Sequence, residues 1–250
     1  MRSFRTLPRG AMVREDVDVN SFIPVTLGIT LLNLYALALI LLRAPLYNTR
    51  VYRPMVWNIW LSISPALVLI AAIASLAFAE IIASSVLRWA TLIFFGLAWL
   101  LMLPNGAYLI TEMNFSHRRE EENVPLWYDI VLVLTLALSG VVNTLANVFL
   151  AHLIFTAAVY PNEAAPMAQP LSWVIVVVLL VLVAFGIYLG RYLRFNSWDL
   201  KNPARFVRKL REHFSSKSRV FAALGFTATH AILLGILYLL IAIPNVAILL

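Results

Sequence analysis

The sequence predicts an all-α membrane protein, a bundle of six transmembrane helices with one short basic helix at the membrane surface. Hydrophobic residues make up 62% of the 250 residues and charged residues only 12%, and the mean hydropathy is +0.88. These values exclude a soluble globular fold. The charged residues are also clustered, which leaves six charge-free intervals of 23 to 33 residues. Because about 20 apolar helical residues cross a bilayer, each interval supplies one span.

The spans are expected to be helices that form a single membrane domain over residues 1–250. Inside lipid, only helices and closed barrels satisfy every backbone N–H and C=O group, and the six intervals lack the alternating pattern of barrel strands. In the second span Pro65 frees a backbone carbonyl, which water or the nearby hydroxyl groups of Ser62 and Ser64 can satisfy, so a kink is expected. The last span is expected to end at Pro244 and Asn245. The expected helices cover about residues 22–42, 56–79, 89–111, 127–151, 171–191 and 220–243.

A short basic segment between the fifth and sixth spans is predicted to form an interfacial helix at about 203–214. Asn202 and Pro203 suit the N-cap and first helical position. The apolar residues that follow fall on one helical stripe and the basic residues fall largely elsewhere, a pattern typical of helices that lie on a membrane surface. The alternative is a solvated basic linker. The stripe consists of Phe206, Val207, Leu210 and Phe214.

The distribution of Lys and Arg predicts the orientation of the spans. Six spans place fourteen of the nineteen basic residues on one face, and only Arg88 and the four arginines of the N-terminal tail on the other. The positive-inside rule makes the first face cytoplasmic and puts both termini outside. Anionic lipids of the cytoplasmic leaflet are therefore the expected partners of the basic face.

The net charge of +7 does not indicate a nucleic-acid partner, because no basic stripe with interleaved aromatic residues lies on a soluble domain. The chain has no cysteine, which excludes disulfides, thiolate metal sites and a cysteine nucleophile. Its four histidines are dispersed, so no metal-ligand spacing is present. We expect no metal and no cofactor.

Three irregular polar segments fall at the same predicted membrane face. They are Leu103-Pro-Asn-Gly-Ala-Tyr-Leu-Ile-Thr-Glu112, Pro125-Leu-Trp-Tyr-Asp129 and Gly190-Arg-Tyr-Leu-Arg-Phe-Asn-Ser-Trp-Asp199. On these segments the chain resembles, over roughly residues 25 to 240, a family of bacterial integral membrane proteins catalogued as domain of unknown function 1361. The sequence departs from the family's pattern at Gly106, where many members have Ala, and at Glu112, where Asp is usual. The resemblance implies the fold, the place of a site and a location in the cytoplasmic (inner) membrane of a bacterium, but no activity.

Our functional hypothesis is a cytoplasm-facing pocket built from these segments. Two arginines can bind a phosphate or carboxylate in bidentate fashion, aromatic side chains can wall the pocket at headgroup depth, and Asp129 is expected to pair with Arg191 or Arg194. An anionic lipid headgroup or a polyprenyl phosphate is the expected ligand. The alternative is that these residues only anchor helix ends. The candidate residues are Asn105, Tyr108, Glu112, Trp127, Tyr128, Asp129, Arg191, Arg194, Asn196, Trp198 and Asp199.

Polar residues deeper in the spans keep two other functions open. Asn143 and Asn147 share one face of the fourth span and His230 lies near mid-membrane in the sixth, so a solute transporter with a path along these two helices is one alternative. The simpler interpretation is hydrogen bonding between helices. Ser139, at a similar depth to His230, suggests an intramembrane serine hydrolase, but Ala137-Leu-Ser-Gly140 lacks the Gly-x-Ser-Gly turn of rhomboid-type proteases.

The third alternative is a scaffold for other membrane subunits. Gly186 and Gly190 form a small-xxx-small pair in the fifth span, which permits close contact between helices. The same pair predicts a possible homo-oligomer.

Overall fold

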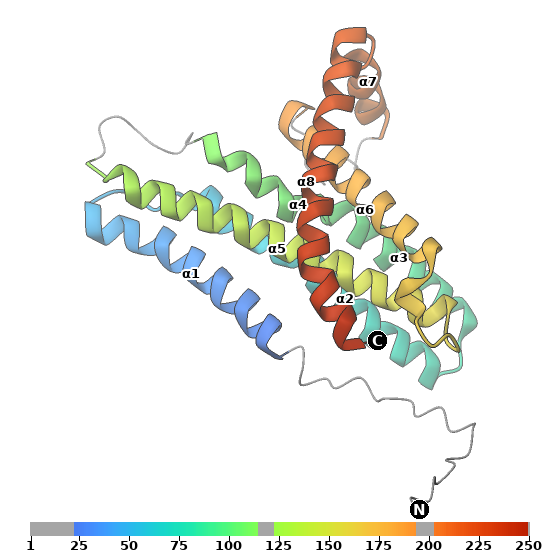
Figure 1. The fold of residues 1–250 in the computed structure, drawn as a ribbon. Helices are drawn as coiled ribbons and strands as arrows, with labels where there is room; N and C mark the ends of the chain where they lie inside the picture. The colour runs from blue at the N-terminus through green and yellow to red at the C-terminus, as the bar shows by residue number, and fades with distance from the viewer. Residues whose placement is uncertain (1–22, 115–122, 194–202, 250) are drawn as a thin grey trace, which may run out of the picture.

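The computed structural model is all-helical where it describes the chain, over residues 23–114, 123–193 and 203–249 (Figure 1). Six of its helical segments are long and apolar enough to cross a membrane, so the chain is a multi-pass membrane protein. The elements are α1 (Ile23–Tyr47), α2 (Arg53–Ile81), α3 (Ser85–Met102), α4 (Pro104–Ala107), the 3₁₀ helix η2 (Tyr108–Asn114), α5 (Leu126–Val159), the 3₁₀ turn η3 (Pro166–Ala168), α6 (Pro170–Tyr188), the π-helical turn η4 (Leu189–Leu193), α7 (Pro203–His213) and α8 (Lys217–Leu249).

Three helices extend at least five residues beyond their predicted ends. α1 continues to Tyr47, past the expected end at 42. α5 continues to Val159, well past the expected end at 151. The expected end of the last helix at Pro244 and Asn245 is wrong, because α8 continues through Pro244 to Leu249. A proline removes one backbone donor, but transmembrane helices tolerate it where other groups satisfy the freed carbonyl.

Pro65 of α2 is an example of such compensation. A proline has no N–H for the carbonyl four residues earlier, which here is that of Leu61. The hydroxyl group of Ser64 donates a hydrogen bond of 2.8 Å to this carbonyl, and α2 stays one helix from Arg53 to Ile81. The structure therefore confirms that a neighbouring serine satisfies the carbonyl that the proline frees.

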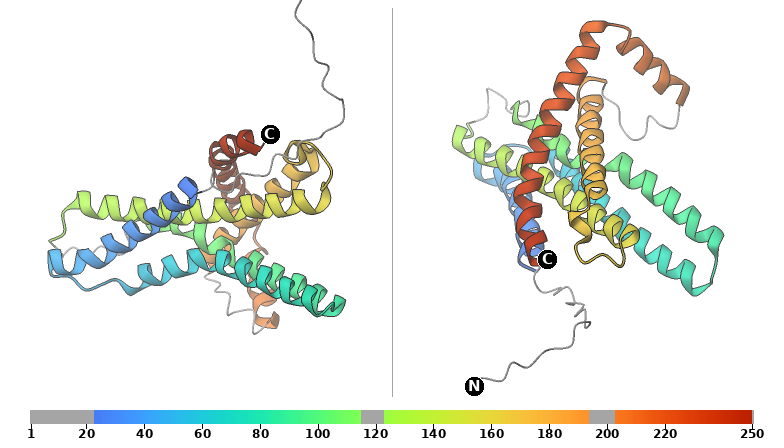
Figure 2. Two further views of the ribbon diagram at one scale, coloured as in Figure 1. Left: turned by 90° about the horizontal axis from the view of Figure 1, so that it is seen from below. Right: turned by 45° about the vertical axis from the view of Figure 1, so that its right-hand side comes forward.

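α5 is the central helix of the bundle. Its most apolar window is 67% buried, whereas the corresponding windows of the other five spans are 11% to 33% buried. It contacts α1, α2, α4, α6 and α8, and Figures 1 and 2 show it running through the middle of the molecule. The large apolar side chains of the other helices are mostly exposed, as expected of surfaces that face lipid.

Two clusters of buried side chains pack against α5, each along a different part of the helix. One joins the outer part of α5 to α3, α6 and α8. The other joins the start of α5 to α1, α2 and η2. The second cluster surrounds the start of α5, so it holds the Pro125–Asp129 segment in place.

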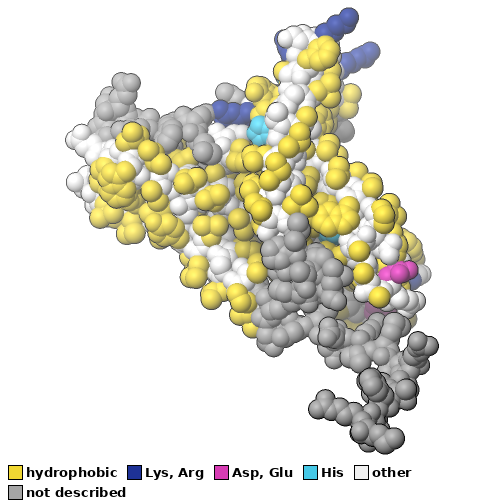
Figure 3. All heavy atoms as spheres, in the orientation of Figure 1, with side chains coloured by type: hydrophobic (Ala, Val, Ile, Leu, Met, Phe, Trp, Pro, Cys, Tyr) yellow, Lys and Arg dark blue, Asp and Glu magenta, His cyan; other side chains and the backbone are white. Residues whose placement is uncertain are grey.

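One end of the bundle, here called the basic face, carries the last residues of α1 and α6, the first residues of α2, α5 and α8, and the whole of α7. Basic side chains gather there, and Figure 3 shows several of them around α7 and the start of α8. At the opposite end Arg88 donates to Glu80 over 3.1 Å. The described basic residues of this face are Arg43, Arg50, Arg53, Arg191, Arg208, Lys209, Arg211, Lys217 and Arg219.

Candidate functional site

The third span changes geometry at the predicted Pro-Asn-Gly break. α3 ends at Met102, and Pro104 begins the short helix α4, which passes into η2. A Cβ added at Gly106 would clash with the hydroxyl of Thr144 and would lie 3.0 Å from the carbonyl oxygen of Gly140. Because neither glycine has a side chain, the backbones of α4 and α5 come into direct contact here.

The two glycines of α6 face this break within the same chain. A Cβ at Gly186 would overlap the ring of Pro104, and one at Gly190 would lie 3.2 Å from the ring of Tyr108. The segments that begin at Leu103 and Gly190 therefore meet, as the sequence predicted. The observed role of Gly186 and Gly190 is packing inside one chain, and the homo-oligomer through these residues stays a prediction.

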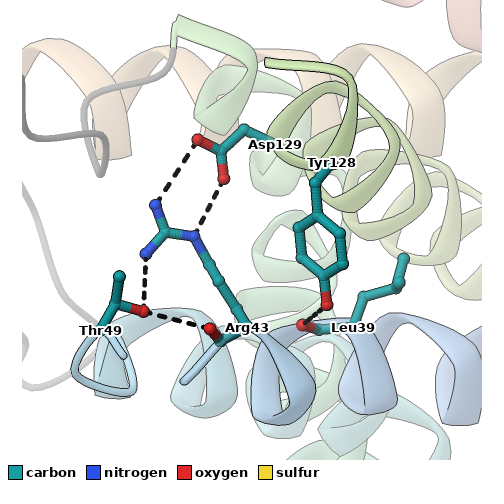
Figure 4. Close-up of polar contacts among 5 residues, drawn as sticks. All are labelled: Leu39, Arg43, Thr49, Tyr128 and Asp129. Atoms are coloured by element: carbon teal, nitrogen blue, oxygen red, sulfur yellow. Dashed lines mark hydrogen bonds and ion pairs between the residues drawn. The ribbon is translucent and has the colours of Figure 1, made fainter. Parts of the chain in front are cut away.

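The start of α5 carries a buried ion pair with α1 (Figure 4). The Arg43 guanidinium donates two hydrogen bonds to the Asp129 carboxylate, from Nε to Oδ1 over 2.9 Å and from Nη2 to Oδ2 over 3.5 Å. Both side chains are almost completely buried. Arg43 also donates to the hydroxyl of Thr49. The structure thus shows Arg43 as a partner of Asp129, which we did not expect. The expected pairing of Asp129 with Arg191 or Arg194 stays a prediction, because Arg194 lies outside the described residues. α1 continues to Tyr47, which keeps Arg43 on a helix that packs along α5.

Tyr128 and Trp127 are neighbours whose rings pack edge to face with centroids 5.6 Å apart but differ in exposure. The Tyr128 hydroxyl donates a 2.8 Å hydrogen bond to the carbonyl of Leu39, and its ring lies edge-on to Tyr47. The side chain of Trp127 is 62% exposed. Tyr128 therefore joins α5 to α1, and only Trp127 is open to a ligand or to lipid at this position.

At the end of α6 the chain forms the π-helical turn η4, which contains Arg191. Arg191 is exposed, and the neighbouring Tyr192 ring is 57% exposed. Asn105 and Tyr108 are half-buried at the break in the third span. The remaining candidates, which are the side chain of Glu112 and residues Arg194, Asn196, Trp198 and Asp199, lie outside the described part of the chain.

A cavity of about 870 Å³ lies between α1, α2 and α5, away from these motif segments. Asn143 and Asn147 line it, whereas Asn105 and Asp129 do not. Asn143 exchanges two 2.9 Å amide hydrogen bonds with Asn33 of α1 and donates to the hydroxyl of Ser62 of α2. Asn147 accepts a hydrogen bond from the indole of Trp99 of α3. These bonds favour the interpretation of Asn143 and Asn147 as a polar seam between helices.

The histidine that links two spans is His152 and not His230. His152 is fully buried in α5, and its Nδ1 lies 2.9 Å from the Tyr238 hydroxyl of α8. His230 is half-buried, and its Nδ1 lies 2.9 Å from the carbonyl of Phe226 in its own helix. Ser139 likewise donates to the carbonyl of Leu136 one turn earlier. Ser139 and His230 are thus each hydrogen-bonded to a carbonyl of their own helix in this structure.

Sequence reasoning missed the partners of the polar residues that it selected. Arg43 was counted only as a charge of the basic face, although its position directly after the first apolar run was a signal that the helix could continue and bury it. Asn33 entered no prediction, yet a mid-span amide needs a partner in a neighbouring helix. No local signal marks Tyr238 as the partner of His152.

The chain belongs to the family described as protein of unknown function DUF1361, whose sequence model matches residues 57–245. The match includes all three motif segments and begins after α1, so Asp129 lies inside the matched region and its partner Arg43 lies before it. No curated protein and no solved structure matches the chain.

Proposed function

We propose that the protein binds an anionic lipid-like ligand at its basic face, which is the cytoplasmic face of a bacterial inner membrane. The observation that carries the proposal is the π-helical turn at the end of α6. This turn coincides with the Gly-Arg-Tyr-Leu motif and holds Arg191 in an exposed position. π-Helical turns are rare and frequently occur at functional sites.

The surroundings of Arg191 have the chemistry that an anionic headgroup needs. The planar guanidinium group can form two parallel hydrogen bonds to a phosphate. The exposed rings of Tyr192 and Trp127 lie on the same face of the bundle, and such rings favour headgroup depth. Gly190 packs against the ring of Tyr108, so the π-helical turn contacts η2 directly.

α7 adds positive charge to this face. His213 at its end lies 2.7 Å from the hydroxyl of Tyr188 in α6, and the adjacent Phe214 stacks on Phe185. These contacts fix α7 near Arg191, with exposed Arg208 and Arg211 on its surface. Basic residues near an anionic membrane surface each contribute about 1 kcal/mol of attraction.

The orientation is part of the proposal. The basic face is assigned to the cytoplasm because fourteen of nineteen basic residues fall there, which places both termini outside. A reporter fused to the C-terminus that is active only in the cytoplasm tests this assignment, and activity of that reporter contradicts it.

Ligand binding is tested with the purified protein in nanodiscs that contain phosphatidylglycerol and phosphatidylcholine. We expect native mass spectrometry to detect retained phosphatidylglycerol, and Arg191→Gln to weaken its retention about fivefold, which corresponds to roughly 1 kcal/mol. Arg88→Gln is the matched control, because Arg88 is an exposed arginine at the opposite end. Equal retention by Arg191→Gln and the unmodified protein, with both folded, contradicts the proposal.

A further inference from the structure

The cavity between α1, α2 and α5 has apolar walls and a polar floor. The walls follow the outer half of α1, the first half of α2 and the second half of α5, and Ile241 of α8 also lines the cavity. The most deeply buried polar residues that line it are Ser62, Asn143 and Asn147, each no more than 6% exposed. The volume of about 870 Å³ falls within the range of roughly 300 to 1,000 Å³ that is usual for ligand sites.

The hydrogen bonds of the floor leave mainly acceptors available. The amide groups of Asn33, Asn143 and Asn147 have six hydrogens, and five of them are donated within the protein. Each of the three amide oxygens accepts one hydrogen bond, and an amide oxygen can accept two. The floor is therefore suited to a ligand that donates a hydrogen bond.

The charge and the hydrophobicity of the lining residues further limit the class of ligand that the cavity can bind. Among the described residues that line the cavity none is charged, so an ionic headgroup would be buried there at high cost. Lipid tails are as apolar as leucine, so hydrocarbon gains little by leaving the bilayer for an apolar groove. Selective binding must then come from the polar floor.

We propose that this groove is a second binding site, for an uncharged lipid with a hydroxyl group. The hydroxyl hydrogen is donated to the amide oxygen of Asn143 or Asn147, and the hydrocarbon lies along α1 and α5. The site is separate from the one proposed at the basic face, because none of the described residues that line the groove belongs to η4 or α7. One site takes an anion at the surface, and the other takes a neutral alcohol within the membrane.

The test uses two probes in nanodiscs that hold the full chain, a long-chain primary alcohol with a photoactivatable diazirine and the methyl ether of the same alcohol. The ether has the same hydrocarbon but no donor. After irradiation, mass spectrometry maps the labelled peptides. We expect the alcohol to label α1 and α5 about three- to tenfold more than the ether, the effect of one hydrogen bond in a membrane.

A groove-filling variant tests the location without altering the polar floor. Gly28 lines the groove, and a Cβ added there meets nothing within 4 Å, so Gly28→Phe fills space without a clash at the backbone. Gly96 of α3 is equally open but lies outside the groove, which makes Gly96→Phe the matched control. We expect labelling of α1 and α5 by the alcohol to fall to the level of the ether in Gly28→Phe and to stay unchanged in Gly96→Phe.

Three results overturn the proposal. Equal labelling by alcohol and ether means that the groove only contacts bulk lipid. Unchanged labelling in Gly28→Phe places the bound alcohol elsewhere. Protection of the groove from both probes, together with a dimer in native mass spectrometry, means that a second copy of the chain covers it. Retention of phosphatidylglycerol at the basic face is independent of all three results.

Discussion

Arg43 and Asp129 form an ion pair that fixes the start of the central helix α5 to the end of α1, with 2.9 Å between guanidinium Nε and carboxylate Oδ1. The side chains of Arg43 and Asp129 are only 6% and 0% exposed, so water cannot solvate either charge if its partner is removed. Tyr128 adds a hydrogen bond to Leu39 on the same helix. The conspicuous Pro-Leu-Trp-Tyr-Asp segment therefore serves, at Tyr128 and Asp129, to join two helices.

Replacing one partner of this ion pair should destabilise the protein. Asp129→Asn leaves the guanidinium of Arg43 buried beside a neutral group, and we expect a loss of about 3 to 5 kcal/mol in the free energy of unfolding. Unfolding midpoints in detergent micelles measure it. The double variant Arg43→Met with Asp129→Leu should recover most of the loss, because no buried charge remains. A small effect of Asp129→Asn, similar to that of Arg50→Ala at an exposed arginine of the same face, would contradict the structural role.

The reciprocal amide pair of Asn33 and Asn143 should couple α1 to α5 energetically. We expect a double-mutant cycle of Asn33→Ala and Asn143→Ala to give a coupling energy of about 0.6 kcal/mol, with an upper bound near 1.7 kcal/mol. Unfolding midpoints of the four proteins provide it. The cycle of Asn33→Ala with Thr156→Ala should show coupling near zero, because Thr156 bonds to Leu153 of its own helix and shares no partner with Asn33. Coupling near zero in the first cycle would show that the pair does not join the helices.

The contact between α4 and α5 should tolerate no side chain at its glycines. A Cβ at Gly140 would clash with the carbonyl of Gly106 and with Leu109, so we expect Gly140→Ala to destabilise the protein by about 1 to 3 kcal/mol. Gly96→Ala is the control, because its Cβ meets nothing within 4 Å and alanine favours a helix. Thermal unfolding of the two variants separates these effects, and similar midpoints would show that α4 and α5 are not in close contact.

The contact between His213 of α7 and Tyr188 of α6 should weaken in acid. Partial burial, and then the positive charge of Arg219, lower the pKa of His213 below the ordinary value of 6.5. The folded protein thus favours neutral His213, and the contribution to stability is complete above pH 6.5 and is lost as the pH falls below it. An NMR titration of the His213 ring measures the pKa.

The charge of Arg219 can be tested separately. We expect Arg219→Gln to raise the pKa of His213 toward 6.5, whereas Lys217→Gln, at an exposed position in the same turn of α8, leaves it unchanged. A titration midpoint above 6.5 in the unmodified protein would contradict the observed surroundings of His213.

Residues that act within one helix were predicted well. Six charge-free intervals fixed six spans because the thickness of the bilayer sets the length of a helix. The Pro-Asn-Gly break in the third span and the basic helix near 203–214 also appear where the sequence placed them, since proline, glycine and helical periodicity act locally.

Residues that act between helices were predicted poorly. The sequence did not indicate that Asp129 bonds to Arg43, which lies 86 residues away in α1. His230 was selected for its depth, but His152 is the buried histidine bonded to another span. Depth follows from counting residues along a helix, whereas the direction of a side chain depends on how neighbouring helices rotate and pack.

The sequence by itself determined that this protein crosses the membrane six times, where its third span breaks and which face carries the positive charge. Only the tertiary structure decided that α5 lies at the centre, that Arg43 bonds to Asp129, and that Asn33, Ser62 and Asn143 line a groove within the bundle. The division has a physical reason. Transfer of each span into lipid depends on its own composition, whereas lipid gives helices no hydrophobic force toward each other, so small residues and hydrogen bonds between distant segments select the packing.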